Sequence, residues 1–123
     1  MRRALLCAAL AAALVASAPA PAAGPPPTAV GVGEREWRIS LYRSKVPTGR
    51  VVFNVHNFGE DGHDLAVRNA SGRVLGAIGE LRPGRSAKLS VRLRKPGRYR
   101  VFCSLEGHEA LGMHALFRVK RRQ

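Results

Sequence analysis

The stretch Tyr99-Arg-Val-Phe-Cys-Ser-Leu-Glu-Gly-His-Glu-Ala-Leu-Gly-Met113 places three potential metal ligands at even intervals. Cys103 offers a thiolate, His108 an imidazole and Met113 a thioether, in the spacing Cys-x4-His-x4-Met. Sulfur ligands of these two kinds favour Cu(I), whereas imidazole nitrogen serves both common oxidation states of copper. The stretch therefore predicts a strand that ends at Cys103 and a short loop that closes around one metal ion.

A fourth ligand is expected from a distant part of the chain. His63 ends the run Asn57-Phe-Gly-Glu-Asp-Gly-His63, and it is expected to open the next strand. His56 is a nearby alternative, but its parity places it on the outer face of the preceding strand. His114 directly follows Met113 and should point the opposite way on a strand, so we expect it at the surface.

Both runs resemble the cupredoxin family of blue, type 1 copper proteins, in the plastocyanin- and azurin-like single-domain form. The resemblance rests on Asn-x-Gly-x-x-x-His, on Tyr-x-x-x-Cys and on Cys-x4-His-x4-Met, and it covers roughly residues 34 to 120. It implies one type 1 copper held by His63, Cys103, His108 and Met113, and single-electron transfer between redox partners. Four protein ligands leave no open position for a substrate, which argues against an enzyme.

Two further functions compete with electron transfer. A copper carrier or buffer of the cell envelope would use a similar metal, although such sites tend to be richer in Met and His than this chain. A metal-free β-sandwich interaction module would make the ligand spacing an accident. A multicopper enzyme would need additional His clusters and domains, and the sequence has neither.

Residues beside the ligands predict how the site is held. Gly107 and Gly112 each stand directly before a ligand, where glycine permits tight backbone turns. Asn57 either links the two ligand loops by hydrogen bonds, as the resemblance implies, or is a simple turn residue. Asp64 follows His63 where many relatives carry Asn, so its charge either lowers the reduction potential or points away from the metal.

The rest of the chain alternates polar and apolar residues between Gly and Pro breaks, which is typical of short β-strands. An all-β, Greek-key β-sandwich of about seven strands is predicted. Trp37, Phe53, Tyr99 and Phe117 are expected in its core, and residues 106–111 are expected to wind briefly into a helical turn. The expected strands cover residues 36–41, 50–56, 63–67, 74–78, 86–93, 98–102 and 115–119.

The N-terminus predicts export to the periplasm, the cell envelope or the medium. Two arginines precede an apolar run, as in a signal peptide, and the run is too short to span a bilayer. An ordinary Sec signal is favoured over a twin-arginine signal. The predicted organisation is a signal peptide over residues 1–23 with cleavage between 18 and 24, a Pro-rich linker over 24–33, a copper domain over 34–120 and a basic tail over 121–123.

Cysteine usage fits the same organisation. Cys7 would leave with the signal peptide, so Cys103 would be the only thiol of the exported domain and could form no internal disulfide. A free thiol is a liability in an oxidising compartment, and metal ligation would protect it.

The 123 residues carry a net charge of +13, from 21 Lys and Arg against 8 Asp and Glu. This charge favours a redox partner with an acidic docking surface, or an anionic envelope surface, through electrostatic steering. No nucleic-acid-binding motif is present, and no transmembrane segment is expected in the exported chain. We expect a monomer that docks weakly through an apolar patch made by Phe58, Leu105, Ala110 and Leu111, ringed by arginines.

Overall fold

The computed structural model describes residues 14–123 and forms nine strands and one short helix within that range. Residues 1–13, which hold much of the predicted signal peptide, lie outside the described residues. The elements are β1 (Thr28–Arg35), β2 (Arg38–Leu41), β3 (Lys45–Pro47), β4 (Gly49–Asn57), β5 (Ala66–Asn69), β6 (Val74–Ala77), β7 (Ser86–Leu93), β8 (Gly97–Phe102), α1 (His108–Leu111) and β9 (His114–Lys120).

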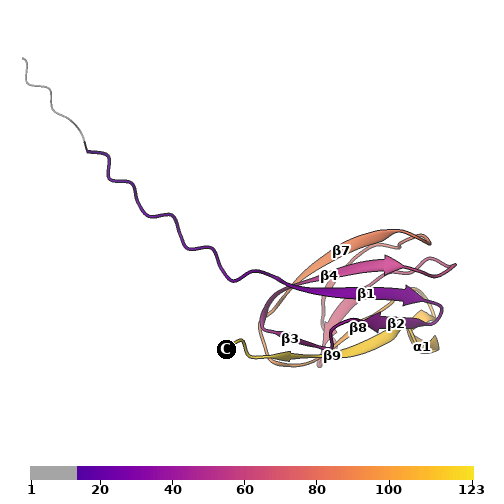
Figure 1. Ribbon diagram of the computed structural model, residues 1–123. Helices are drawn as coiled ribbons and strands as arrows, with labels where there is room; N and C mark the ends of the chain where they lie inside the picture. Colours follow the sequence, from indigo (N-terminus) through magenta and orange to yellow (C-terminus); the bar gives the residue numbers. More distant parts are fainter. Residues whose placement is uncertain (1–13) are drawn as a thin grey trace, which may run out of the picture.

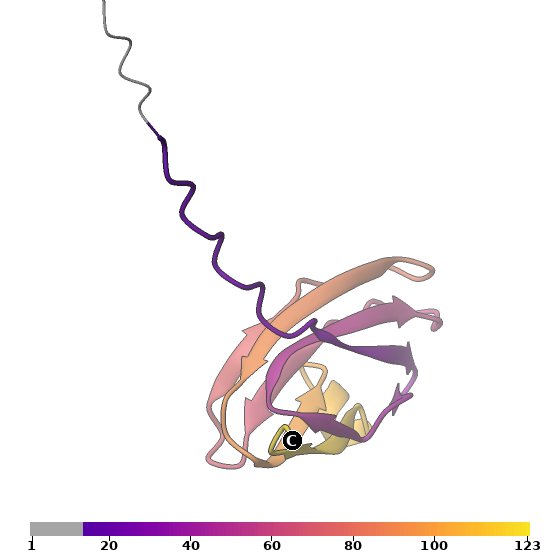
Figure 2. The ribbon, with the colours of Figure 1, turned by 60° about the vertical axis from the view of Figure 1, so that its left-hand side comes forward.

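The strands form two facing sheets, and this arrangement confirms the predicted β-sandwich (Figures 1 and 2). One sheet has the order β2-β1-β4-β7 and the other the order β3-β9-β8-β5-β6. Both sheets are mixed, because β1 runs parallel to β4 and β3 runs parallel to β9. Nine strands form where about seven were expected, since β1 and β3 had been assigned to linker and turn.

Strand β1 corrects the predicted boundary between linker and domain. Residues 28–33 were assigned to the linker 24–33, but they pair with β4 over the whole length of β1. Gly31 and Gly33 disguise the strand, because they replace side chains on its outer face. A Cβ atom on Gly31 would lie 2.7 Å from the ring of Tyr42, so the glycine makes room for the aromatic ring that covers it.

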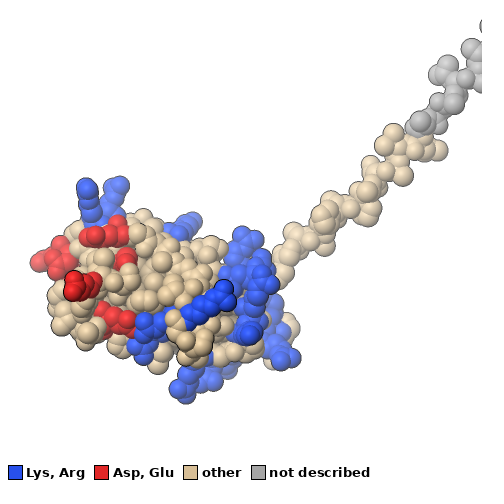
Figure 3. All heavy atoms as spheres, turned by 180° about the vertical axis from the view of Figure 1, so that it is seen from behind, with Lys and Arg blue, Asp and Glu red and all other residues tan. Residues whose placement is uncertain are grey.

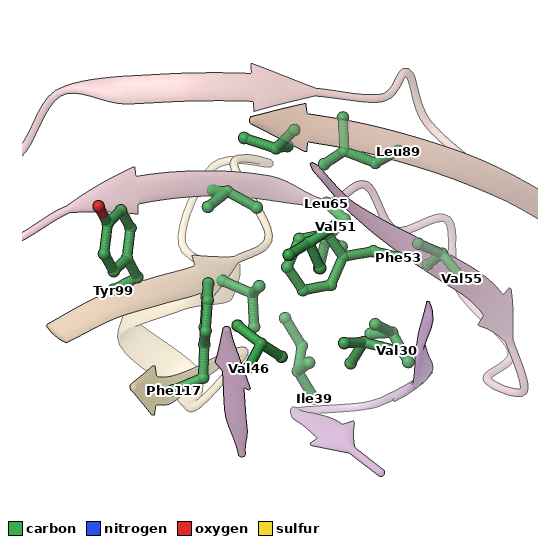
Figure 4. Close-up of a cluster of buried hydrophobic side chains, with 14 of the residues drawn as sticks. Val30, Ile39, Val46, Val51, Phe53, Val55, Leu65, Leu89, Tyr99 and Phe117 are labelled. Atoms are coloured by element: carbon green, nitrogen blue, oxygen red, sulfur yellow. The ribbon is translucent and has the colours of Figure 1, made fainter. Parts of the chain in front are cut away.

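The core fills the space between the two sheets (Figure 4). Alternating residues of each long strand point into this space, which is the expected consequence of the two-residue period of a strand. Three of the aromatic residues predicted for the core pack together there. The ring centroid of Phe117 lies 5.5 Å from that of Phe53 and 5.6 Å from that of Tyr99. Phe53, Tyr99 and Phe117 are buried as predicted. Trp37, however, is 38% exposed and lies in the turn between β1 and β2.

The two ends of the sandwich differ in what they carry. The β1–β2 turn, the end of β4, the end of β8 and helix α1 meet at one end, which we call the metal end (Figure 1). The N-terminal segment leaves the fold at the opposite end, where the C-terminus also lies. Among the described residues, no helix has the length and apolar character needed to cross a membrane.

Candidate metal centre

Three of the four predicted ligands meet at the metal end. The ligand atoms of His63, Cys103 and His108 all lie within 4.8 Å of one another. The Nδ1 atoms of His63 and His108 are 3.3 Å apart, and Cys103 Sγ lies 3.6 Å from His108 Nδ1. Two imidazole nitrogens therefore converge on one thiol, although the residues come from positions 63, 103 and 108 of the chain.

Backbone hydrogen bonds close the loop between Cys103 and Met113. The N–H of Cys103 donates to the carbonyl of Met113 at 3.0 Å, and the N–H of Met113 donates to the carbonyl of His108 at 3.1 Å. Gly107 and Gly112 adopt φ angles of +77° and +125°, which confirms that both turns need glycine. The brief helical turn expected here is α1, and Met113, whose backbone bonds to both Cys103 and His108, is fully buried.

His63 was predicted to be the first residue of a strand, but its backbone forms only an isolated β-bridge. Its backbone exchanges hydrogen bonds with Leu81 and with no other residue in the described part of the chain, and β5 begins later, at Ala66. Asn57 stabilises this segment by donating from Nδ2 to the carbonyls of Asp61 and Leu81 at 2.7 and 2.9 Å. Asn57 thus braces the loop that precedes His63, and these bonds do not reach the Cys103 loop.

Asp64, and not Asn57, connects the His63 segment to the Cys103 loop. Its buried carboxylate accepts hydrogen bonds from the backbone N–H and the hydroxyl of Ser104, next to the Cys103 ligand. The Asp64 N–H in turn points at Cys103 Sγ from 3.5 Å. The carboxylate therefore turns toward the Cys103 loop, and its hydrogen bonds hold the two loops together.

The two residues of the β1–β2 turn reach the site, and sequence reasoning missed both contacts. Glu36 Oε1 lies 2.8 Å from His63 Nε2, on the side of the ring away from Nδ1. The same oxygen accepts hydrogen bonds from the N–H groups of Asp61 at 2.8 Å and Glu60 at 3.0 Å. Hydrogen bonding, led by the Asp61 N–H, lowers the pKa of Glu36 to about 2, so this carboxylate is ionised across the neutral range.

Trp37, the other residue of the turn, covers the second histidine. Its ring meets the His108 ring edge to face, with centroids 4.9 Å apart. A Cβ atom on Gly112 would lie 2.7 Å from the Trp37 carbonyl oxygen, so the turn and the ligand loop are in close contact. The prediction that Trp37 belongs to the core is therefore wrong: β2 begins only at Arg38, and the turn carries Trp37 onto the metal end.

An ion-pair network anchors α1, which carries His108. Arg68 on β5 and Arg100 on β8 both donate to the carboxylate of Glu109, at 3.0 and 3.3 Å. Partial burial alone would raise the pKa of Glu109, but the hydrogen bonds from the two arginines lower it. The helix is thereby attached to the sheet beneath it.

The donor set suits copper. Burial raises the pKa of Cys103 to about 11, and a buried, ordinarily neutral thiol next to two imidazoles is a ligand that a soft metal ion would deprotonate. A thiolate, two imidazoles and a thioether make up the donor set of a type 1 copper site, and Cys103, His63, His108 and buried Met113 would supply it. The other two histidines stay outside the cluster: His56 bonds to Ser86 Oγ at 2.6 Å, and His114 is exposed as predicted.

Known proteins share this fold. Auracyanin from the photosynthetic bacterium Roseiflexus castenholzii is similar at TM-score 0.67 and 19% identity, covering 76% of this chain and 97% of its own. Auracyanin A, described as a blue copper protein from Chloroflexus aurantiacus, gives TM-score 0.65 and 13% identity over 77% and 100% of the chains. An azurin from Methylomonas sp. strain J gives TM-score 0.62 and 15% identity over 78% and 98%.

At these identities the solved structures show the fold alone. A comparison with curated proteins gave no match. The family model of the cupredoxin-like domain, however, matches residues 6–113, which is most of the chain. The chain belongs to the cupredoxin-like family.

Proposed function

We propose that this domain binds one type 1 copper through His63, Cys103, His108 and Met113 and carries single electrons between redox partners. The observation that carries the proposal is the convergence of two imidazole Nδ1 atoms on a buried thiol, within 4.8 Å. Bound copper would supply a one-electron couple. The similarity to auracyanins and azurin supports the same function.

In such a reaction the protein would hold the side chains that bind the metal in fixed positions. Cys103 and Met113 are joined by a backbone hydrogen bond, His63 is bridged to Leu81, and Asp64 connects the two ligand loops. A frame fixed in this way changes little between oxidation states, which keeps the barrier to electron transfer small. It also leaves no open position for a substrate, so we propose a carrier and not an enzyme.

Electrons would enter and leave where a ligand approaches the surface. Of the four proposed ligands, His108 alone is partly exposed, while His63, Cys103 and Met113 are buried. The Trp37 ring packs against the His108 ring. Leu111, which is 58% exposed and lies on the same helix as His108, adds apolar surface there. We propose that a redox partner docks weakly at this end over a small area.

The charge of that partner stays a prediction. A partner with an acidic surface was expected from the net charge, but the connections at the metal end carry the carboxylates Glu36, Glu60, Asp61 and Glu106. A mainly apolar contact is the better proposal for this end. We also propose that the domain works outside the cytoplasm, on the strength of the N-terminal sequence.

Titration of the purified domain with Cu(II), followed by visible absorption and EPR, tests the proposal. We expect an intense blue thiolate-to-copper band and a narrow copper hyperfine splitting at one equivalent. A pale product with square-planar parameters would indicate an open, His-dominated site and favour a copper carrier or buffer. Absence of binding would refute both and leave the interaction module.

A further inference from the structure

Charge is unevenly distributed over the two ends of the sandwich. All eight Asp and Glu residues of the chain lie on strand ends and connections at the metal end. The acidic side chains visible in Figure 3 gather at the end away from the N-terminal segment. Lys and Arg gather at the opposite end, near the point where the N-terminal segment leaves the fold. The net charge of the protein is therefore concentrated on one end, far from the metal.

We call this end the basic pole. Its cations come from the β2–β3 and β7–β8 connections, the β5–β6 turn, the adjoining strand ends and the C-terminal tail. Among the described residues, none of them forms an ion pair. They are Arg43, Lys45, Arg50, Arg73, Arg92, Arg94, Lys95, Arg98, Arg118, Lys120, Arg121 and Arg122.

We propose that the basic pole binds the surface of an anionic phospholipid bilayer, so that the metal end faces away from it. A lipid surface is broad and needs no groove, and it attracts every cation held within about 10 Å of it. Each such Lys or Arg strengthens binding roughly fivefold. The eight carboxylates are all far from the contact and would not oppose it.

The course of the chain agrees with this orientation. Residues 14–27 extend from the basic pole and connect it to the apolar run that begins at Ala4 (Figures 1 and 2). Before cleavage, the proposed export would hold that run at the membrane, so the fold would face the bilayer with its basic pole. This inference does not depend on bound metal and goes beyond the proposed function.

Cosedimentation of metal-free protein with vesicles tests the basic pole. Phosphatidylcholine vesicles with and without phosphatidylglycerol are compared in salt from about 0.05 M to about 0.5 M. One variant replaces Arg94, Lys95, Arg98 and Arg121 with Gln at the basic pole. A matched variant loses the same charge at or near the metal end, through substitution of Arg38, Arg82, Arg85 and Lys88 with Gln.

We expect the wild type to bind only the vesicles that contain phosphatidylglycerol, and high salt to release it. The basic-pole variant loses four cations worth roughly fivefold each, so it should bind several hundredfold more weakly, while the matched variant should bind almost as well as the wild type. Equal losses in the two variants would mean that only net charge matters and would refute a defined pole. Lack of binding to either vesicle would refute the proposal outright.

A second, independent observation concerns Glu36, and the inference drawn from it rests on the proposed function. Glu36 contacts His63 Nε2 at 2.8 Å while the Nδ1 of the same ring faces Cys103 and His108. A carboxylate on the far nitrogen of a ligand histidine fixes its tautomer and makes the imidazole a stronger donor. We infer that Glu36 is a positioning residue that favours Cu(II) over Cu(I) and so lowers the reduction potential.

The contact also fixes the ring in space. Glu36 is tied by the N–H groups of Glu60 and Asp61, so its position does not depend on the histidine alone. Its neighbour Trp37 contacts the other ligand histidine, His108. The β1–β2 turn therefore acts as a third loop of the metal centre, although it contributes no ligand.

Glu36→Gln tests the inference, because the amide oxygen can still accept the hydrogen bonds while the negative charge is lost. Glu60→Gln is the control, since it removes an exposed charge from the loop before His63. We expect Glu36→Gln to raise the reduction potential and to weaken Cu(II) binding by roughly tenfold to a hundredfold, with the control near the wild type. If the wild type is blue and the two variants share its potential, Glu36 has no such role; a colourless wild type would refute the proposed function instead.

Discussion

Glu34 carries a strong prediction about the pH dependence of folding. Its side chain is 0% exposed and points between the sheets from β1, and neither carboxyl oxygen has a hydrogen-bond partner within residues 14–123. Burial raises the pKa of Glu34 from 4.5 to about 8, with a further contribution from the charge of Asp64. Near neutral pH the folded protein therefore holds a proton on Glu34 that the unfolded chain releases.

The sign and size of the effect follow from that difference in pKa. Below pH 4.5 the carboxyl group of Glu34 is protonated in both the folded and the unfolded state, so it does not change the free energy of unfolding with pH. As the pH rises from 4.5 to about 8, the unfolded state ionises first and the free energy of unfolding falls. At about 1.4 kcal/mol per pKa unit, the loss is of the order of 5 kcal/mol and is complete above about pH 8.

Chemical unfolding of the metal-free domain at about pH 5 and about pH 8.5 measures this loss. The fluorescence of Trp37, the single tryptophan, reports the transition. Glu34→Gln should unfold with nearly the same free energy at both pH values, whereas Glu60→Gln, which removes an exposed charge, should keep the wild-type dependence. A Glu34→Gln protein that loses as much stability between the two pH values as the wild type would refute the argument.

Three further predictions concern the ligand loop. Cys103→Ser should bind copper without the intense blue band while keeping the β-rich circular dichroism of the wild type, and retention of the band would show that Cys103 is not a ligand. Met113→Gln should keep the colour but change the reduction potential, measured by redox titration, and an unchanged potential would place Met113 outside the coordination sphere. Gly112→Ala should destabilise the domain by about 1 to 3 kcal/mol, because the φ angle is +125° and the new Cβ would lie 2.7 Å from the Trp37 carbonyl. Gly79→Ala is its control in denaturant unfolding, since nothing lies within 4 Å of a Cβ atom there.

The sequence was most informative where the determinants are local. Cys103, His108 and Met113 lie within one short loop, so their spacing alone predicted that they would meet. The structure brings the first two together and buries the third. Alternation likewise predicted the sandwich, because a two-residue period is visible in any strand that has a side chain on each face.

Long-range contacts were where the sequence failed. The alternating pattern of β1 was hidden by Gly31 and Gly33, which have no side chains. The rings of Tyr42 and Phe58 occupy the space where those side chains would lie. Once β1 was assigned to a linker, no hairpin could be predicted between β1 and β2, and the contacts of its turn with the metal centre were lost as well. Trp37 was placed in the core because it shares the alternation of Ile39 and Leu41 in the predicted strand 36–41.

The carboxylates explain why acidic residues gather at one end of such a basic protein. Glu36 holds His63, Asp64 ties the His63 segment to the Cys103 loop, and Glu109 fastens the helix of His108 to the sheet. Each accepts hydrogen bonds from donors that the folded metal end brings together, so the positions of these three carboxylates are tied to the ligands. Three of the eight anionic side chains are held at the ligand loops in this way, and the opposite end is almost purely cationic. Part of the charge polarity of the protein thus follows from how its metal centre is held, and a variant that lost these three carboxylates would be expected to lose ligand order before it lost the sandwich.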